Sequence, residues 1–140
     1  MADEIRSCAG GIVFRDGKVF LLRTPDGEWS MPKGVIREHN PSNTVALWRV
    51  EDEAGIHAEI IGIAGNTSHE FFSESRGKYV TNRIQWFCMR AADGAFRVNS
   101  EQGFTDGGYF SVDEAAGLLT REKEAERVKK AAAIYEKKAR

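Results

Sequence analysis

The chain is poor in the residues that mark several protein classes. It has only two cysteines, Cys8 and Cys88, and they are not spaced as a metal-binding pair. This excludes a disulfide-rich scaffold and a cysteine metal centre, so we expect free, buried thiols. It has three prolines and no repeat or low-complexity segment, so no linker is expected to divide it.

The chain also lacks a strong charge of either sign and lacks long hydrophobic runs. Its net charge is −1, and no apolar stretch approaches the roughly 20 residues that span a bilayer. The first residues lack the apolar core of a secretory signal. These absences argue against a dedicated nucleic-acid or membrane role and favour a cytoplasmic protein.

What the chain does contain fits one small globular domain. It has 140 residues, of which 41% are hydrophobic and 29% charged. These values are ordinary for a single domain with one core, so we expect residues 1–140 to form one domain.

Turn signals and hydrophobic spacing predict strands on either side of one central helix, with two further helices at the end. The predicted strands cover residues 8–15, 18–24, 58–64, 70–72 and 83–90, with a short strand ending at 110. The predicted helices cover residues 41–54, 112–119 and 122–138. Asp16-Gly17 predicts a hairpin turn, and Ser111 with Glu114 predicts a capping box.

The central helix has clear predicted ends. Asn40 is expected to cap its first turn, with Pro41 at the first helical position, and Gly55 is expected to end it. Helical spacing then brings Arg49, Asp52 and Glu53 onto one face, where Arg49 can pair with either acid. Two carboxylates could hold a hard cation such as Mg²⁺, whereas a guanidinium repels it.

Residues 34–56 read Gly-Val-Ile-Arg-Glu-His-Asn-Pro-Ser-Asn-Thr-Val-Ala-Leu-Trp-Arg-Val-Glu-Asp-Glu-Ala-Gly-Ile. This segment resembles the Nudix box, which is Gly, five residues, Glu, seven residues, then Arg-Glu-aliphatic-x-Glu-Glu-x-Gly-aliphatic. The matching positions are Gly34, Val50, Glu53, Gly55 and Ile56, with Asp52 as a shortened Glu. Asn40, Trp48 and Arg49 stand where the family has Glu, Arg and Glu.

The resemblance implies an α/β (α+β) fold, the Nudix α/β/α sandwich with a mixed sheet. Residues 77–87 and 109–115 look most like the group that hydrolyses dinucleoside polyphosphates and diphosphoinositols. In that family a metal-activated water attacks a pyrophosphate link, so an active member would need Mg²⁺ or Mn²⁺. Nudix-like domains often pair, which leaves a homodimer open.

Site residues follow from the same resemblance. It implies catalytic carboxylates on Asp52 and Glu53, metal ligands from Gly34, Asp52, Glu53 and Glu101, and substrate contacts from Lys33, Arg49 and Arg83. It also suggests that Trp29, Phe72 or Tyr79 stacks on a base.

The three departures from the box predict a homologue of the nucleoside diphosphate-linked phosphoanhydride hydrolases whose metal-dependent catalysis is weakened or lost. One alternative is a non-catalytic nucleotide-binding or regulatory module, without a cofactor, in which Arg49 binds phosphate directly. Another is hydrolysis with a relocated site that uses Glu38, Glu51 or Glu101. In each case the ligand is a small nucleotide or another phosphoanhydride, and its identity stays open.

Overall fold

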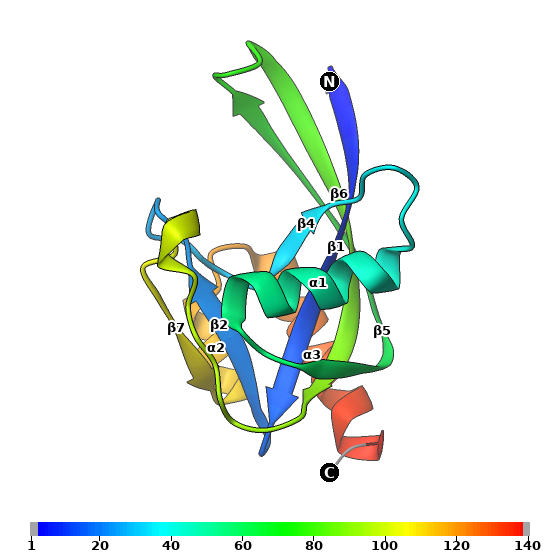
Figure 1. Ribbon diagram of the computed structural model, residues 1–140, viewed down its shortest axis with the longest axis vertical. Coiled ribbons are helices and arrows are strands. Elements are labelled where there is room, and N and C mark those ends of the chain that lie inside the picture. The colour runs from blue at the N-terminus through cyan, green and yellow to red at the C-terminus, as the bar shows by residue number, and fades with distance from the viewer. Residues whose placement is uncertain (1–2, 139–140) are drawn as a thin grey trace.

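The computed structural model describes residues 3–138, which form one mixed sheet between helices (Figure 1). The strands are β1 (Glu4–Arg15), β2 (Lys18–Arg23), β3 (Trp29–Ser30), β4 (Lys33–Val35), β5 (Ala58–Ser73), β6 (Lys78–Ala91) and β7 (Asp106–Phe110). The helices are α1 (Ser42–Ala54), α2 (Val112–Leu118) and α3 (Glu122–Lys138), and a 3₁₀ turn, η1, covers Ser100–Gln102. No helix within residues 3–138 is long and apolar enough to cross a membrane.

The sheet has the strand order β3-β2-β1-β6-β5, with β4 also paired to β1 and β7 to β2. Strands β1 and β6 run parallel, and the other pairs run antiparallel. One face is covered by α1 and the other by α2 and α3 (Figure 1). The predicted α/β/α sandwich with a mixed sheet is therefore confirmed.

Two apolar layers hold the helices to the sheet. Alternate residues of a strand point to opposite faces, so Ile12 of β1 packs toward α2 and α3 while Val13 packs toward α1. Trp86 of β6 is fully buried in the first layer, and its indole N–H donates to the Thr67 hydroxyl over 2.9 Å. Both cysteines are buried and free, as expected.

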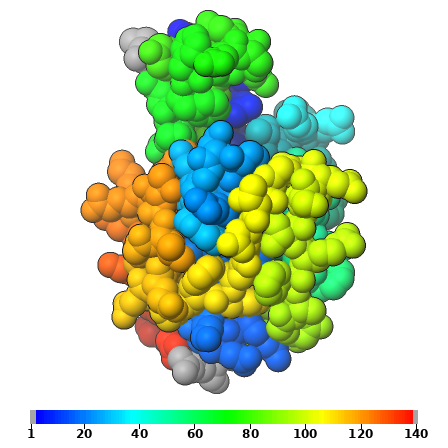
Figure 2. All heavy atoms as spheres, turned by 90° about the vertical axis from the view of Figure 1, so that its left-hand side faces the viewer, coloured from blue at the N-terminus to red at the C-terminus, as the bar shows by residue number. Residues whose placement is uncertain are grey.

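A three-stranded extension projects from the body of the domain. The hairpin of β5 and β6, together with the start of β1, rises beyond the helices in Figure 1 and forms the green lobe at the top of Figure 2. The pairing of β5 shifts register between Ile60 and Gly62 and again between Ile63 and Gly65, and it is regular from Asn66 to Ser73. Such β-bulges bend and twist a strand.

The strand β5 corrects the sequence prediction, which split it into residues 58–64 and 70–72. The connecting residues, Asn66 to His69, are polar, and Asn66 and Ser68 are exposed because β5 is an edge strand with a solvated face. An edge strand does not need apolar residues on both faces, so the polar sequence of this part of β5 resembled that of a loop.

The loop before α1 also corrects a prediction. Pro41 is at the cap position without a side-chain hydrogen bond, and the Asn40 amide instead donates to the Arg37 carbonyl over 2.8 Å. Glu38 and His39 both have left-handed backbone angles, with φ of 55° and 60°, which turn the chain just before the helix. Asn40 therefore closes this turn and does not cap α1.

Three predicted local signals are confirmed, whereas β1 and β6 begin earlier than predicted, at Glu4 and Lys78. Asp16 and Gly17 have φ of 51° and 78°, as the tight hairpin turn requires, and Gly55 ends α1 with φ of 64°. The Ser111 and Glu114 capping box is present at the start of α2.

Candidate functional site

The end of α1 directs a carboxylate into the protein. Glu53 is 5% exposed, and its Oε1 accepts the backbone N–H of Lys33 over 3.3 Å. Burial raises the pKa of the Glu53 carboxyl to about 7, although the nearby positive charges of Lys33 and Arg49 oppose this rise. A carboxyl group with a pKa near neutrality can exchange a proton at physiological pH.

The side chain of Arg49 lies directly on Gly34. A Cβ added to Gly34 would collide with Arg49 Nε and come 2.6 Å from its Cδ, so only glycine leaves room for this arrangement. Arg49 Nη1 also lies 3.9 Å from Asp52 Oδ2, which confirms one of the two predicted ion pairs. The predicted pair with Glu53 is not among the ion pairs of residues 3–138, because Glu53 turns inward while Asp52 stays half-exposed.

The turn η1 is tied to the same end of α1. Gln102 Nε2 donates to Asp52 Oδ2 over 2.5 Å, and the Asn99 side-chain amide donates to the Asp52 carbonyl over 2.9 Å. The Asn99 backbone N–H donates to the Glu53 carbonyl over 3.0 Å. These bonds hold η1, which contains Glu101, against the end of α1, and the Glu101 side chain is exposed to solvent.

Two cavities meet beside this cluster. The first, about 260 Å³, is lined by Lys33, Gly34 and Glu53 and reaches across the sheet to Asn82. The second, about 360 Å³, shares Lys33 and Asn82 with the first and extends toward the start of α3. Because Lys33 and Asn82 line both, the two cavities adjoin, and we refer to them together as the cleft.

The residues around Gly34 do not fit a divalent ion in this arrangement. Such an ion needs several oxygen ligands, and no group of three His, Cys, Asp or Glu side chains within residues 3–138 is placed to hold one. Arg49 covers the Gly34 backbone, and Asp52 bonds to Gln102. The assignment of Gly34, Asp52, Glu53 and Glu101 as metal ligands therefore stays a prediction.

The remaining predicted residues lie outside this cluster. Arg83 lines a separate cavity of about 570 Å³, and strand alternation directs its side chain to the face opposite Asn82. Trp48 is 55% exposed on the outer side of α1. Of the proposed substitute acids, Glu51 faces solvent with His57 3.7 Å away, and Glu38 is exposed in the loop before α1.

The aromatic residues suggested for base stacking lie elsewhere. Trp29 packs edge to face against Phe110, with ring centroids 5.4 Å apart. Phe72 and Tyr79 pair with each other on the outer extension, and both are about half-exposed. None of these three lines either cavity of the cleft, where the aromatic lining residues are Phe104 in the first and His69 and Phe71 in the second.

A buried polar pair at the cleft has no counterpart in the sequence predictions. Glu124 of α3 is 1% exposed and accepts the Ser30 hydroxyl proton over 2.9 Å, and Lys33 Nζ lies 3.4 Å from the same hydroxyl. Glu124 lies among the many charged residues of a helix expected to be solvated, so the sequence pattern gave no signal for its burial.

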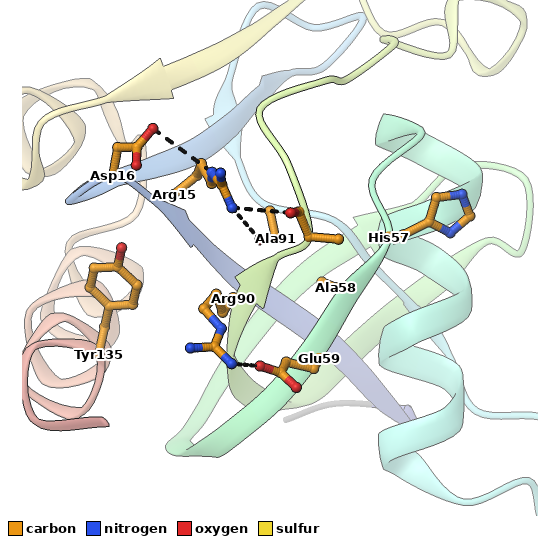
Figure 3. Close-up of a pocket in the computed structure, with 9 residues that line it drawn as sticks. Arg15, Asp16, His57, Ala58, Glu59, Arg90, Ala91 and Tyr135 are labelled. Atoms are coloured by element: carbon orange, nitrogen blue, oxygen red, sulfur yellow. Dashed lines mark hydrogen bonds and ion pairs between the residues drawn. The ribbon is translucent and has the colours of Figure 1, made fainter. Parts of the chain in front are cut away.

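A larger cavity lies at the opposite end of β1 and β6 (Figure 3). It measures about 640 Å³, and its charged groups bond to one another. Arg15 donates to the carbonyl oxygens of Ala91 and Ala92 and lies 3.8 Å from Asp16, while Arg90 pairs with Glu59. Both arginines that line it are thus engaged within the described chain, so we place the candidate site at the cleft beside Lys33 and Glu53.

Comparisons with known proteins bear on the family and the fold. The family profile described as the NUDIX domain matches residues 5–132. A curated protein of Sphingopyxis alaskensis, named RNA pyrophosphohydrolase, is 34% identical over 98 residues. The match covers 61% of this chain and 62% of that protein, so the chain spans less than two thirds of its relative.

Solved structures share the fold at low sequence identity. A C. elegans Ap4A hydrolase has a TM-score of 0.70 at 16% identity, covering 94% of this chain and 98% of its own. The E. coli dihydroneopterin triphosphate pyrophosphohydrolase has a TM-score of 0.73 at 17% identity, covering 88% and 92%. At sequence identities this low, the comparisons show a shared fold and nothing further.

Proposed function

This chain belongs to the Nudix family, and we propose that it binds a nucleoside diphosphate-linked or other phosphoanhydride with Arg49 in place of the family's divalent ion. Metal-dependent hydrolysis is then weakened or lost. The observation that carries the proposal is the Arg49 side chain lying directly on Gly34, so close that any β-carbon at position 34 would collide with it.

The guanidinium of Arg49, lying on Gly34, suits an anionic ligand. A guanidinium stays charged and offers several N–H donors in one plane, which match the oxygens of a phosphate group. Arg49 is about one third exposed, so it can reach a ligand while paired with Asp52. Lys33 lines the cavity beside Gly34 and Glu53 and adds a second positive charge. The Sphingopyxis relative, named for pyrophosphohydrolysis of RNA, supports a pyrophosphate link in the ligand.

A second candidate is slow hydrolysis with Glu53 as a general base. The buried Glu53 carboxyl, whose pKa is raised to about 7, lines the cavity and can take a proton from water at neutral pH. On this alternative, the unmodified chain releases phosphate slowly and Glu53→Gln abolishes the release.

The first candidate is tested through the charge of residue 49. We expect tripolyphosphate to bind the unmodified chain equally well in EDTA and in Mg²⁺, by calorimetry. Arg49→Glu should weaken the EDTA binding at least tenfold and create Mg²⁺ binding. Arg37→Glu is the matched control, because it makes the same charge change on an exposed loop residue and should leave both properties unchanged.

Hydrolysis measured on the same variants completes the test. A large gain of Mg²⁺-dependent phosphate release in Arg49→Glu would show that one residue disables the site, and no gain would mean that Trp48 and Asn40 matter as well. The proposal is wrong if the unmodified chain binds tripolyphosphate only with Mg²⁺, or if Arg49→Glu and Arg37→Glu weaken binding equally.

A further inference from the structure

Two buried carboxyl groups contact Lys33 at its two ends, one directly and one through a serine. Glu53 of α1 accepts the Lys33 backbone N–H over 3.3 Å. Glu124 of α3, which is 1% exposed, accepts the Ser30 hydroxyl proton over 2.9 Å, and the same hydroxyl oxygen lies 3.4 Å from Lys33 Nζ. The proposed function assigns no role to Glu124 or to Ser30.

The backbone around Ser30 explains how a hydroxyl group of β3 meets α3. Trp29, the residue before Ser30, forms a β-bridge with Leu119. The Trp29 N–H donates to Thr120 Oγ1 over 3.1 Å, and the Thr120 N–H donates to the Trp29 carbonyl over 3.3 Å. These bonds hold the connection between α2 and α3 against β3. Ser30 therefore lies beside the first turn of α3, which contains Glu124.

The single proton of Ser30 gives this network a direction. A serine hydroxyl has one proton and two lone pairs, and Ser30 donates its proton to Glu124 Oε1. Toward Lys33 the Ser30 oxygen can then only accept, and an ammonium group can only donate. Glu124 thus keeps Ser30 Oγ available as an acceptor for Lys33 Nζ. An ammonium group has three protons, so two are left for the oxygens of a ligand.

Burial keeps this network in place. Ser30 is 2% exposed and Glu124 is 1% exposed, so both are shielded from competing water. A lysine side chain has many rotamers, and holding it in one of them before a ligand arrives removes an entropic cost from binding. Lys33 lines both cavities of the cleft, so the ammonium group is held beside the space that a ligand would occupy.

We propose that Glu124 and Ser30 are positioning residues, which act through Lys33 by holding its ammonium group ready for a phosphate of the ligand. This inference rests on the proposed function for the presence of a phosphate in the cleft. It predicts an effect opposite in sign to that of charge alone. Glu124 is an acid that lines the cleft, so its charge by itself would weaken the binding of an anion, whereas positioning of Lys33 strengthens it.

Two substitutions of Glu124 separate positioning from charge. Glu124→Leu removes both the charge and the acceptor, whereas Glu124→Gln removes the charge and keeps an oxygen that can accept the Ser30 proton. In calorimetry with tripolyphosphate in EDTA, we expect Glu124→Leu to bind about fivefold more weakly than the unmodified chain, and Glu124→Gln to recover that loss. Glu122→Leu is the matched control, because Glu122 is exposed in the same turn of α3, and it should stay within about twofold.

A double-mutant cycle tests whether the effect passes through Lys33. Ser30→Ala removes the link between Glu124 and Lys33 and should also weaken binding about fivefold. It should have no further effect once Lys33 is replaced by Met, which lacks the ammonium group. Ser7→Ala is the matched control, because Ser7 is exposed and lines neither cavity of the cleft. Glu124→Leu and Ser30→Ala test the same link, so either one suffices if the other fails to fold.

Three results would overturn the positioning role. Tighter binding by Glu124→Leu would mean that Glu124 acts on the ligand only as a repelling charge. Equal weakening by Glu124→Leu and Glu124→Gln would mean that the bond accepted from Ser30 is not what matters. An effect of Ser30→Ala that persists in the Lys33→Met background would exclude the route through Lys33.

Failure of this inference can be told apart from failure of the proposed function. Tripolyphosphate binding that depends on Arg49 but is unchanged in Glu124→Leu and Ser30→Ala overturns the positioning role alone. Binding that is weakened in those two variants but unchanged in Arg49→Glu supports the positioning role and overturns the placement of Arg49. The absence of any binding by the unmodified chain at millimolar tripolyphosphate overturns both.

Discussion

Replacing Glu53 by Gln should stabilise the protein at alkaline pH and leave its stability unchanged in acid. Gln keeps the size of the side chain and an oxygen that can accept the Lys33 backbone N–H. It removes the cost of holding an ionised carboxylate in a site that is only 5% exposed. The difference between the two proteins should therefore depend on pH.

The sign and size of this difference in stability follow from the pKa of the Glu53 carboxyl, which burial raises from 4.5 to about 7. Between these values the folded protein keeps a proton that the unfolded chain has released, so stability falls as pH rises. The interval of about 2.5 pH units, at about 1.36 kcal/mol per unit, lowers the free energy of unfolding by about 3 kcal/mol at pH 8. Below pH 4.5 both states are protonated and the cost disappears.

The measurement is urea unfolding of the unmodified chain and of Glu53→Gln at pH 4 and pH 8. For a domain of this size, about 3 kcal/mol also corresponds to a rise in melting temperature of roughly 10 °C. Glu101→Gln, which changes an exposed carboxyl in η1, should show no pH-dependent difference. Equal stability of Glu53→Gln and the unmodified chain at pH 8 would refute the assigned burial cost.

Three further substitutions test the packing of the site and the core. Gly34→Ala should lower the free energy of unfolding by less than about 1 kcal/mol, because the flexible Arg49 side chain can move aside. The same substitution should cost nothing once Arg49 is replaced by Ala. A urea double-mutant cycle that shows no such coupling would contradict the contact between the two residues. Trp86→Phe should lose about 2 kcal/mol through a lost hydrogen bond and a cavity, while the exposed Trp48→Phe stays within about 0.5 kcal/mol in the same urea assay. Ser111→Ala should lose about 1 kcal/mol with its helix cap, measured by thermal unfolding, and an unchanged melting temperature would contradict the capping role.

The sequence was sufficient where a local rule decides the structure. The Asp16-Gly17 turn, the Gly55 helix end and the Ser111 cap each depend on a few neighbouring residues, and each is present. The resemblance to the Nudix box likewise predicted the sandwich, and helical spacing predicted the contact of Arg49 with Asp52. These features need no knowledge of distant strands.

The sequence was insufficient where the register between distant segments decides. Phe71 and Phe72 are adjacent aromatics, and strand alternation requires that one faces the cleft, but only the pairing of β5 with β6 and of β6 with β1 shows which one. The burial of Glu53 was not predicted for the same reason. Helical spacing placed Glu53 beside Arg49, whereas its burial depends on the contact with Lys33 of β4.

The parallel pairing of β1 with β6 has a consequence for the newly made chain. Apolar residues of β1 from Cys8 to Phe14 find their parallel neighbours only between Ile84 and Arg90. A ribosome must therefore release most of the domain before this segment can be enclosed on that side, and contacts between such distant segments form slowly. Until then the segment is a target for chaperones or for aggregation, and the yield of folded protein should depend on how quickly the second half of the chain follows.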